Sequence, residues 1–269
     1  MFSDNNRIKI EDKKIDADLN DVELSNRLFV RLVAKERRFT KIDFKYCIFD
    51  TAYLRQCIFD SCDFTGCRFT GTSLYGSTFA GCKFEYTTFE RTIVTTDLLR
   101  NSCPALENLK LRFARTLRVN YQQLGDAQAA NMAIHVELDA TKEHLWKAWH
   151  SNESYYRHKY SGWKRIKAFL DWIAFKLLDW IWGNGESAWK LLRAVVILLV
   201  LIAARDVFIS RDPSQVGSYF AAAAEAPQIL LGTLSPPNYS PGYLSAIVFC
   251  RLVAFALFMS IIIKRFNRR

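Results

Sequence analysis

Residues 39–94 read FTKID-FKYCI-FDTAY-LRQCI-FDSCD-FTGCR-FTGTS-LYGST-FAGCK-FEYTT-FERTI-V, and this stretch decides the fold of the N-terminal part of the chain. A phenylalanine or leucine opens every five-residue block, and valine continues the series. Neither a helix, with its period of 3.6, nor a strand, with its period of 2.0, repeats every five residues. The smaller side chains stand two residues before the next large one: Ile42, Cys47, Ala52, Cys57, Cys62, Cys67, Thr72, Ser77, Cys82, Thr87 and Thr92.

This five-residue period, with one large and one small inward position, resembles the pentapeptide-repeat family. The resemblance implies a β-solenoid, a right-handed four-sided β-helix with one block on each side. Its coils stack about 4.8 Å apart, and each coil is stabilised mainly by its neighbours. The twelve centres from Phe39 to Val94 are enough for three coils, and Leu24 and Phe29 extend the phase towards a fourth. We therefore expect residues 1–97 to form a cytoplasmic β-helix.

The chain has seven cysteines, and five of them lie in the repeat. Their spacings are multiples of five, as in the repeat, and no CxxC pair of the kind that binds zinc occurs among them. We interpret them as small buried residues that stay reduced in a cytoplasmic domain. No metal site and no cofactor are expected.

The charge of the chain is unevenly distributed. Residues 1–97 hold fifteen Lys and Arg against fifteen Asp and Glu, whereas residues 188–269 hold nine against three. Some pentapeptide-repeat proteins mimic duplex DNA, which requires an acidic surface, so neither this mimicry nor a duplex DNA partner is expected. A basic cluster near the start is a solvated face, a cap, or a site for an anionic small-molecule or oligonucleotide regulator. It consists of Arg31, Lys35, Arg37, Arg38, Lys41 and Lys45.

Helical spacing replaces the five-residue period after Asp97, and residues 98–162 are predicted to form a helical hairpin. The segment LRVNYQQLGD, residues 117–126, is similar to a hairpin with a Gly-Asp turn in bacterial pentapeptide-repeat proteins with channel-like tails. Residues 163–187 begin with WKRIKAFLDWIAFKLLDWIW, which mixes four tryptophans with Lys and Asp. Charges interrupt this stretch too often for a spanning helix, so we expect an amphipathic helix in the membrane interface.

Residues 188–269 are predicted to contain two transmembrane helices, at about 189–209 and 242–263. Basic residues precede the first and follow the second, so both termini are expected in the cytoplasm of a multi-pass protein of the bacterial inner membrane. Between them, residues 218–241 are predicted to form a re-entrant helix and loop. This order resembles the pore of two-transmembrane potassium channels, and WGNGESAW at 182–189 resembles the segment that leads into such pores in bacterial pentapeptide-repeat proteins.

The loop departs from that resemblance at the place of the selectivity filter. Potassium channels carry TVGYG there, and its carbonyl oxygens replace the ion's hydration shell. Here the filter-like residues are Thr233, Leu234, Ser235, Pro236, Pro237 and Asn238. Potassium selectivity is therefore not expected, and a less selective pore or a non-conducting anchor remains.

Arg251 lies within the second predicted span, where a charge costs about 2.5–3.5 kcal/mol on insertion scales. We expect it to face a pore, a water-filled cavity or a carboxylate, for which Glu225 is one candidate. If several copies of Arg251 line an open pathway, they repel cations. The alternative, to which we give equal weight, is that Arg251 forms a structural ion pair inside the helix bundle.

Together these features predict an oligomeric gated ion channel, by resemblance a homotetramer, that contacts the lipid bilayer. Its β-helix would sense a ligand or partner, and by analogy it would act in antiphage defence under a nucleotide-type signal. The alternative is a non-conducting, membrane-anchored scaffold for protein interaction. An enzyme is not expected, because the chain has no phosphate-binding glycine loop, nucleophile elbow or metal-ligand set.

Overall fold

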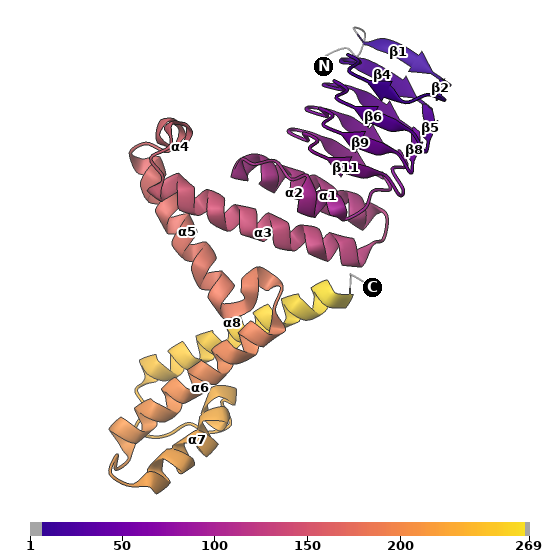
Figure 1. Ribbon diagram of the computed structural model, residues 1–269. Coiled ribbons are helices and arrows are strands. Elements are labelled where there is room, and N and C mark those ends of the chain that lie inside the picture. Colours follow the sequence, from indigo (N-terminus) through magenta and orange to yellow (C-terminus); the bar gives the residue numbers. More distant parts are fainter. Residues whose placement is uncertain (1–6, 267–269) are drawn as a thin grey trace. The chain divides into compact units, whose positions relative to one another are not determined.

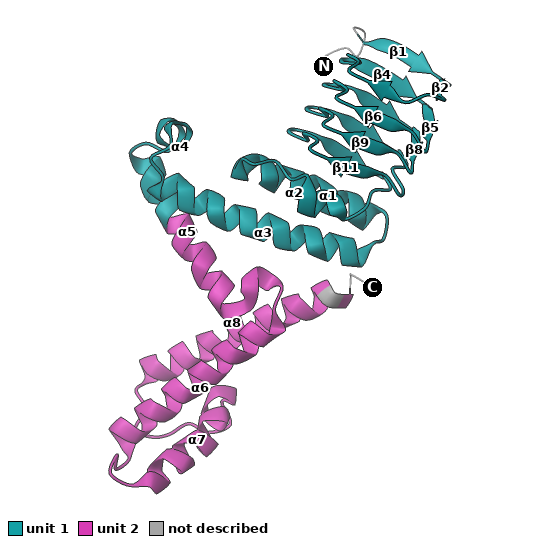
Figure 2. Cartoon of the chain, viewed as in Figure 1, with its two compact units in different colours: residues 1–169 teal, residues 170–269 magenta. Residues whose placement is uncertain are grey.

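The computed structural model describes residues 7–266 and consists of two compact units, residues 1–169 and 170–269 (Figure 2). The first unit contains a four-sided β-solenoid and the helices that follow it. The second contains the three long helices of the C-terminal part. Asn267, Arg268 and Arg269 of the predicted basic tail lie outside the described residues, as do the first six residues of the predicted β-helix domain.

The solenoid is built from short parallel strands, as the five-residue period predicts, and makes about four turns (Figure 1). Its strands are β1 (Ile8–Glu11), β2 (Lys14–Ile15), β3 (Leu19–Asn20), β4 (Arg27–Val30), β5 (Val33–Lys35), β6 (Arg38–Thr40), β7 (Ile48–Asp50), β8 (Tyr53–Arg55), β9 (Ile58–Asp60), β10 (Arg68–Thr70), β11 (Thr78–Ala80) and β12 (Thr88–Glu90).

Each side of the solenoid stacks one strand or bridge from every coil. The first side has the order β1-β4-β7-β10-β12, the second β2-β5-β8, and the third β11-β9-β6-β3. On the fourth side, isolated parallel bridges link Glu23, Asp43, Asp63 and Lys83. Because Phe49 pairs with Phe69 and Phe69 with Phe89, equivalent residues are 20 positions apart, which is four blocks of five.

The first coil departs from this spacing by one residue. Ile10 pairs with Phe29 and Ile15 with Ala34, both 19 positions on, whereas Leu19 pairs with Phe39 at 20. The block between Ile15 and Leu19 is thus four residues long. This one-residue deletion hides Ile10 and Ile15 from a search at period five, although both pack against the core.

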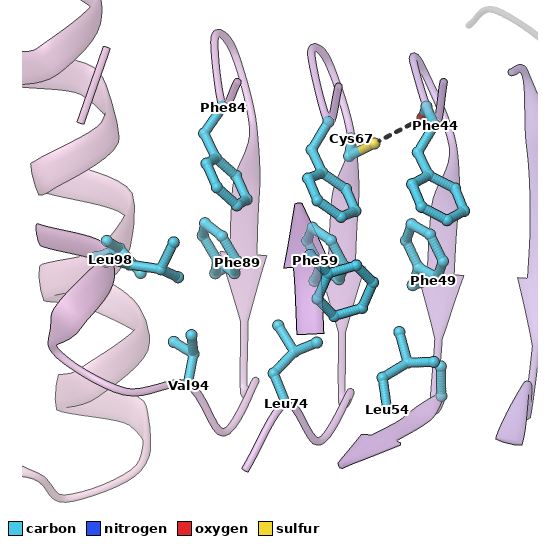
Figure 3. Packing of buried hydrophobic residues seen from close by; sticks show 14 of the residues in the cluster. Phe44, Phe49, Leu54, Phe59, Cys67, Leu74, Phe84, Phe89, Val94 and Leu98 are labelled. Carbon is cyan, nitrogen blue, oxygen red and sulfur yellow. Dashed lines mark hydrogen bonds between the residues drawn. The ribbon is translucent and has the colours of Figure 1, made fainter. Parts of the chain in front are cut away.

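The interior of the solenoid contains columns of stacked phenylalanine rings (Figure 3). On the first side, neighbouring ring centroids are 5.0 Å apart for Phe29 and Phe49, 4.8 Å for Phe49 and Phe69, and 5.2 Å for Phe69 and Phe89. Their planes are within 17° of parallel, which is the offset-stacked contact that aromatic rings favour. Each ring is almost fully buried, so the column supplies much of the apolar burial that holds the coils together.

The smaller inward side chains do more than fill space. Cys67 Sγ donates a hydrogen bond to the carbonyl of Phe44 at 2.9 Å, and Thr87 Oγ1 donates to that of Phe64 at 2.7 Å. Both acceptors lie 23 residues earlier, in the preceding coil. Cys, Thr and Ser share this position because each is small and carries a donor. Burial raises the pKa of the Cys47 thiol to about 11, which keeps it protonated as such a donor.

Four helices follow the solenoid in the first unit: α1 (Asp97–Asn101), α2 (Glu107–Gln123), α3 (Ala127–His150) and α4 (Ser154–Lys159). Helices α2 and α3 pack along each other (Figure 1). The turn between them contains Gly125 at φ 74°, and the Asp126 side chain caps α3 by accepting from the amide of Ala129 at 2.9 Å. The predicted hairpin with its Gly-Asp turn is thus present.

Helix α2 covers the open edge of the last coil. Its side chains carry the acceptors that the next coil would have supplied: Thr116 Oγ1 accepts from the amide of Phe89 at 3.2 Å, and Asn120 Oδ1 from that of Thr92 at 2.7 Å. Asn120 Nδ2 also donates to the Thr92 carbonyl at 2.8 Å. Phe113 packs under the ring of Phe89, with centroids 6.0 Å apart. An unpaired strand edge is thereby closed by a helix.

Helix α5 (Trp163–Trp182) continues from the first unit into the second and ends at η1 (Gly183–Gly185). The second unit contains α6 (Ala188–Ser210), α7 (Val216–Leu231) and α8 (Pro241–Phe266). Helix α7 packs on α6 and also contacts α8. A small apolar core, including Ile202, Ile229 and Ile247, joins these three helices.

Candidate functional site

The predicted basic cluster is spread over at least three sides of the solenoid. Lys35 is in β5 on the second side and Arg38 in β6 on the third, while Lys45 follows the bridge of Asp43 on the fourth side. The physical reason is the corner after every fifth residue, which sends successive blocks to different sides. Residues close in sequence are therefore separated around the coil, and an anionic-ligand site among these residues stays a prediction.

Several of these cations also have carboxylate partners. Arg31 makes ion pairs with Glu11 at 2.8 Å and Asp12 at 2.6 Å. Lys45 contacts Asp43 at 3.0 Å and, in the next coil, Asp63 at 3.6 Å. Lys35 contacts Glu36 at 3.2 Å. Exposed pairs of this kind add little stability, but they reduce the positive charge that an anionic ligand would meet.

A different feature distinguishes the second side of the solenoid. Tyr53 and Tyr75 project from adjacent coils, and the Arg55 guanidinium lies over both rings, 5.3 Å and 4.7 Å from their centroids. Tyr75 is 56% exposed. The sequence carries a signal for this group, because Tyr53, Arg55 and Tyr75 all occupy outward positions of blocks on one side. Tyrosine and arginine are common at the centres of protein interfaces.

The junction of α3 and α4 holds a partly buried histidine. His144 lies between two tyrosines: its Nδ1 is 3.3 Å from the Tyr156 hydroxyl and its Nε2 is 3.1 Å from that of Tyr160. Burial, and then the nearby charge of Lys159, lower the pKa of His144. Here the histidine ties two helices together.

The second unit exposes most of its apolar surface. Among the described residues, one segment, Pro241–Lys264 of α8, is long and apolar enough to cross a membrane, with a mean hydropathy of 2.6. Only 11% of this segment's most apolar part is buried, so α8 is not the core helix of a globular unit. Helix α6 has 23 residues but also Lys190, Arg193, Arg205 and Asp206, so its role as the first predicted span stays a prediction.

Apolar grooves accompany this exposed surface. One, of about 430 Å³, lies between α6 and α7 and is lined by residues such as Val200, Ala203 and Ala223. Another, of about 310 Å³, lies along α6 and α8, with Leu198 and Val253 in its wall. Exposed apolar surface of this extent marks a contact with lipid or with another protein chain.

Charged side chains gather where α6 ends and α7 passes. Arg211 donates through Nε to Asp206 at 2.6 Å and through Nη2 to Glu225 at 2.5 Å. Asp206 is 3% exposed and also accepts from the Tyr239 hydroxyl at 3.1 Å. The Arg205 guanidinium lies 3.6 Å from the centroid of the Tyr243 ring. This network ties together the end of α6, helix α7 and the start of α8.

The ionic partner of Glu225 is therefore Arg211. Arg251, for which Glu225 was one candidate partner, donates from Nη1 to the main-chain carbonyl of Leu231, the last residue of α7. The sequence analysis missed the pairing because Arg211 lies in the loop between the predicted elements. Its bond to Asp206 of α6 brings the guanidinium over α7, beside Glu225.

The filter-like residues link α7 to α8. Gly232 ends α7 in the left-handed conformation, and Thr233 turns back so that its amide and hydroxyl both bond the Gln228 carbonyl, at 2.9 Å and 3.1 Å. Leu234 packs against the core of the unit, and the Pro236 carbonyl accepts from the amide of Tyr239 at 3.2 Å. In this single chain Ser235, Pro237 and Asn238 are exposed.

Comparison with known proteins identifies the repeat. The family model described as pentapeptide repeats matches eight copies, over residues 38–74 and 47–85. No significant match was found among curated protein sequences.

Similar solved structures include trypsin-treated QnrB1, described as a plasmid-mediated fluoroquinolone resistance protein. The match has 20% identity and a TM-score of 0.18, and it covers 33% of this chain. It spans 54% of the QnrB1 chain, about half of that protein's length. The N-terminal part of the chain is therefore a solenoid of pentapeptide repeats, followed by a helical region with one helix apolar enough to span a membrane.

Proposed function

We propose that this protein is an oligomeric, gated ion channel whose pentapeptide-repeat solenoid senses a ligand or partner. The observation that carries the proposal is the exposure of α8: only 11% of the most apolar part of its segment Pro241–Lys264 is buried in one chain. Such a surface needs lipid on one face and protein on another. If α6 also spans the membrane, together with α8, both termini lie on the cytoplasmic side of the bacterial inner membrane.

Oligomerisation follows from the size of the membrane unit. Helices α6 and α8 of one chain enclose too little space for a pore, and the grooves along α6 leave room for the side chains of a neighbouring copy. A homotetramer with α7 re-entering from one side is the arrangement that the order of α6, α7 and α8 favours.

The signal enters through the first unit. Helix α2 is hydrogen-bonded to the last coil by Asn120 and packs on α3. A change in the solenoid on ligand binding would therefore act directly on these helices. An anionic small molecule or oligonucleotide of the nucleotide-signal type is the proposed regulator, and membrane permeabilisation during antiphage defence is the proposed role. A regulator acts only by binding the open and closed states with different affinity.

Ion flux through the purified protein in liposomes tests the channel. The wild type is compared with Pro236→Ala in the loop and with Ile58→Ala, a matched surface change on the solenoid. Flux that changes with Pro236→Ala and not with Ile58→Ala supports a pathway at the loop. Absence of flux from assembled oligomers, both in the full chain and after removal of residues 1–97, contradicts the proposal.

A membrane-anchored scaffold is the second candidate. The exposed group of Tyr53, Arg55 and Tyr75 on a flat side of the solenoid favours it, since tyrosine and arginine dominate binding energy at many interfaces. The lack of Gly-Tyr-Gly at residues 233–238 favours it too. A scaffold predicts that Tyr75→Ala weakens capture of a partner and that liposomes containing the protein stay impermeable to ions.

A further inference from the structure

We infer that the pathway of this protein selects anions, and that Arg251 of α8, which bonds the carboxyl end of α7, is the residue that sets this preference. The inference rests on the channel proposed above and names the class of ion it conducts.

Arg251 lies near the middle of α8. It is ten residues after Pro241, which at a rise of 1.5 Å per residue is about 15 Å along the helix. A bilayer core is about 30 Å thick, so a spanning α8 holds Arg251 close to the midplane. A charge at this depth is costly unless it faces a polar group or water, and such residues usually line an ion or substrate path.

The group that Arg251 meets is the end of a helix. Its Nη1 donates to the carbonyl of Leu231, at the C-terminus of α7. A helix C-terminus carries the equivalent of about half a negative charge, which on its own attracts cations. A full positive charge placed there reverses the sign. The carboxyl end of the re-entrant helix would attract cations by itself. With the Arg251 guanidinium bound to it, this end attracts anions.

Gly232 leaves room for the Arg251 guanidinium beside the Leu231 carbonyl. It has φ 76°, a conformation that favours glycine, and a Cβ at this position would collide with Nη1 of Arg251. The close approach of the guanidinium and the absence of a side chain at residue 232 therefore belong together.

The surrounding carboxylates do not cancel the charge. Asp206 and Glu225 both bond Arg211, and within residues 7–266 no ion pair joins Arg251 to a carboxylate. A guanidinium has five N–H donors, and the bond to Leu231 occupies one. The hydrogen bond between Arg251 and Leu231 is itself exposed in the single chain, so the site opens away from the core of the unit. Donors that remain can bind a passing anion such as chloride.

The experiment is a reversal-potential measurement in a potassium chloride gradient, on the full-length oligomer in planar bilayers. The wild type is expected to be anion-selective. Arg251→Gln, which keeps a donor for the Leu231 carbonyl but not the charge, should lower the chloride-to-potassium permeability ratio by about tenfold or more. Arg251→Glu should make the pathway cation-selective. Arg193→Gln is the control, since Arg193 also donates to a main-chain carbonyl, that of Trp180, but lies at the start of α6.

Gly232→Ala keeps the charge and displaces the guanidinium, so it should lower the same ratio by a smaller factor and provides a test if Arg251→Glu does not assemble. A cation-selective wild type overturns the inference and leaves the channel standing. A chloride-to-potassium permeability ratio that stays unchanged in both Arg251→Gln and Gly232→Ala also overturns the inference and leaves the channel standing. Complete absence of conductance removes the channel, and with it the selectivity.

Discussion

Phe64 shows how single residues hold the solenoid. Its ring lies between Phe44 and Phe84, with both centroids 5.1 Å away, and it is buried at 1% exposure. Phe44, Phe64 and Phe84 come from three successive coils, so the middle ring contacts the coils on both sides of it. Removal of a ring leaves a cavity that neighbouring coils cannot fill without losing their own strand register.

We expect Phe64→Ala to destabilise the solenoid by about 3–5 kcal/mol, as large-to-small changes of buried phenylalanine do. Tyr75→Ala, on the surface of the same solenoid, should cost about 1 kcal/mol or less. Hydrogen exchange of peptides from residues 39–94 measures the difference. Equal loss of protection in the two variants would show that the column is not the main source of stability.

His144 makes the junction of α3 and α4 sensitive to pH. Its pKa is lowered in the folded state from an ordinary value of about 6.5, so the unfolded state binds a proton more readily. The junction is most stable above pH 6.5 and loses stability as the pH falls from 6.5 to the lowered pKa. The charge of Lys159 adds to this lowering of the pKa, while the charge of Glu107 opposes it.

The expected result is faster exchange of amides in residues 127–160 at pH 5.5 than at pH 7.5, after correction for intrinsic rates. His144→Gln should remove this difference, and the exposed His135→Gln should preserve it. A difference that survives in His144→Gln would assign the pH dependence to another group.

At the scale of elements, α2 decides where the solenoid ends. A further coil would have offered amide and carbonyl partners to Thr92, and Asn120 provides both from one side chain. Asn120 is fully buried, so water cannot replace it. The spacing of Thr116, Asn120 and Gln123 places all three on one face of α2, which matches the edge of the last coil.

Asn120→Ala should therefore destabilise the first unit by about 2–4 kcal/mol, because it leaves a buried amide and a buried carbonyl without partners. Gln123 accepts from the amide of Arg91 at an exposed position, and Gln123→Ala should cost less than about 1 kcal/mol. Urea unfolding of the two variants, followed by protection of peptides from residues 86–96, compares them. A larger effect at Gln123 would contradict this account of the cap.

For the whole molecule, the central prediction concerns topology. Two spans place both ends of the chain on one side of the membrane and the loop of residues 211–215 on the other. In a Cys250→Ser background, a cysteine introduced by Ser214→Cys should react in intact cells with a membrane-impermeant maleimide. One introduced by Tyr75→Cys should react only after lysis. Reaction of both in intact cells, or of neither, would exclude the two-span arrangement.

The sequence by itself determined the solenoid, because a coil of four five-residue blocks forces large and small side chains into fixed columns that are visible as a period. It also determined the hairpin with Gly125 and the apolar helix α8, since both are local signals. The five-residue period did not reveal the first coil, because one missing residue shifts Ile10 and Ile15 out of phase with Phe29 and Ala34.

Only the tertiary structure decided which charges meet. Lys35, Arg38 and Lys45 are close in sequence but lie on different sides because the chain turns a corner after every block. Glu225 was one candidate partner for Arg251, but the packing of α7 on α6 brings it to Arg211, and Arg251 bonds the carboxyl end of α7. Long-range pairings depend on how helices and coils pack, and no local pattern records them.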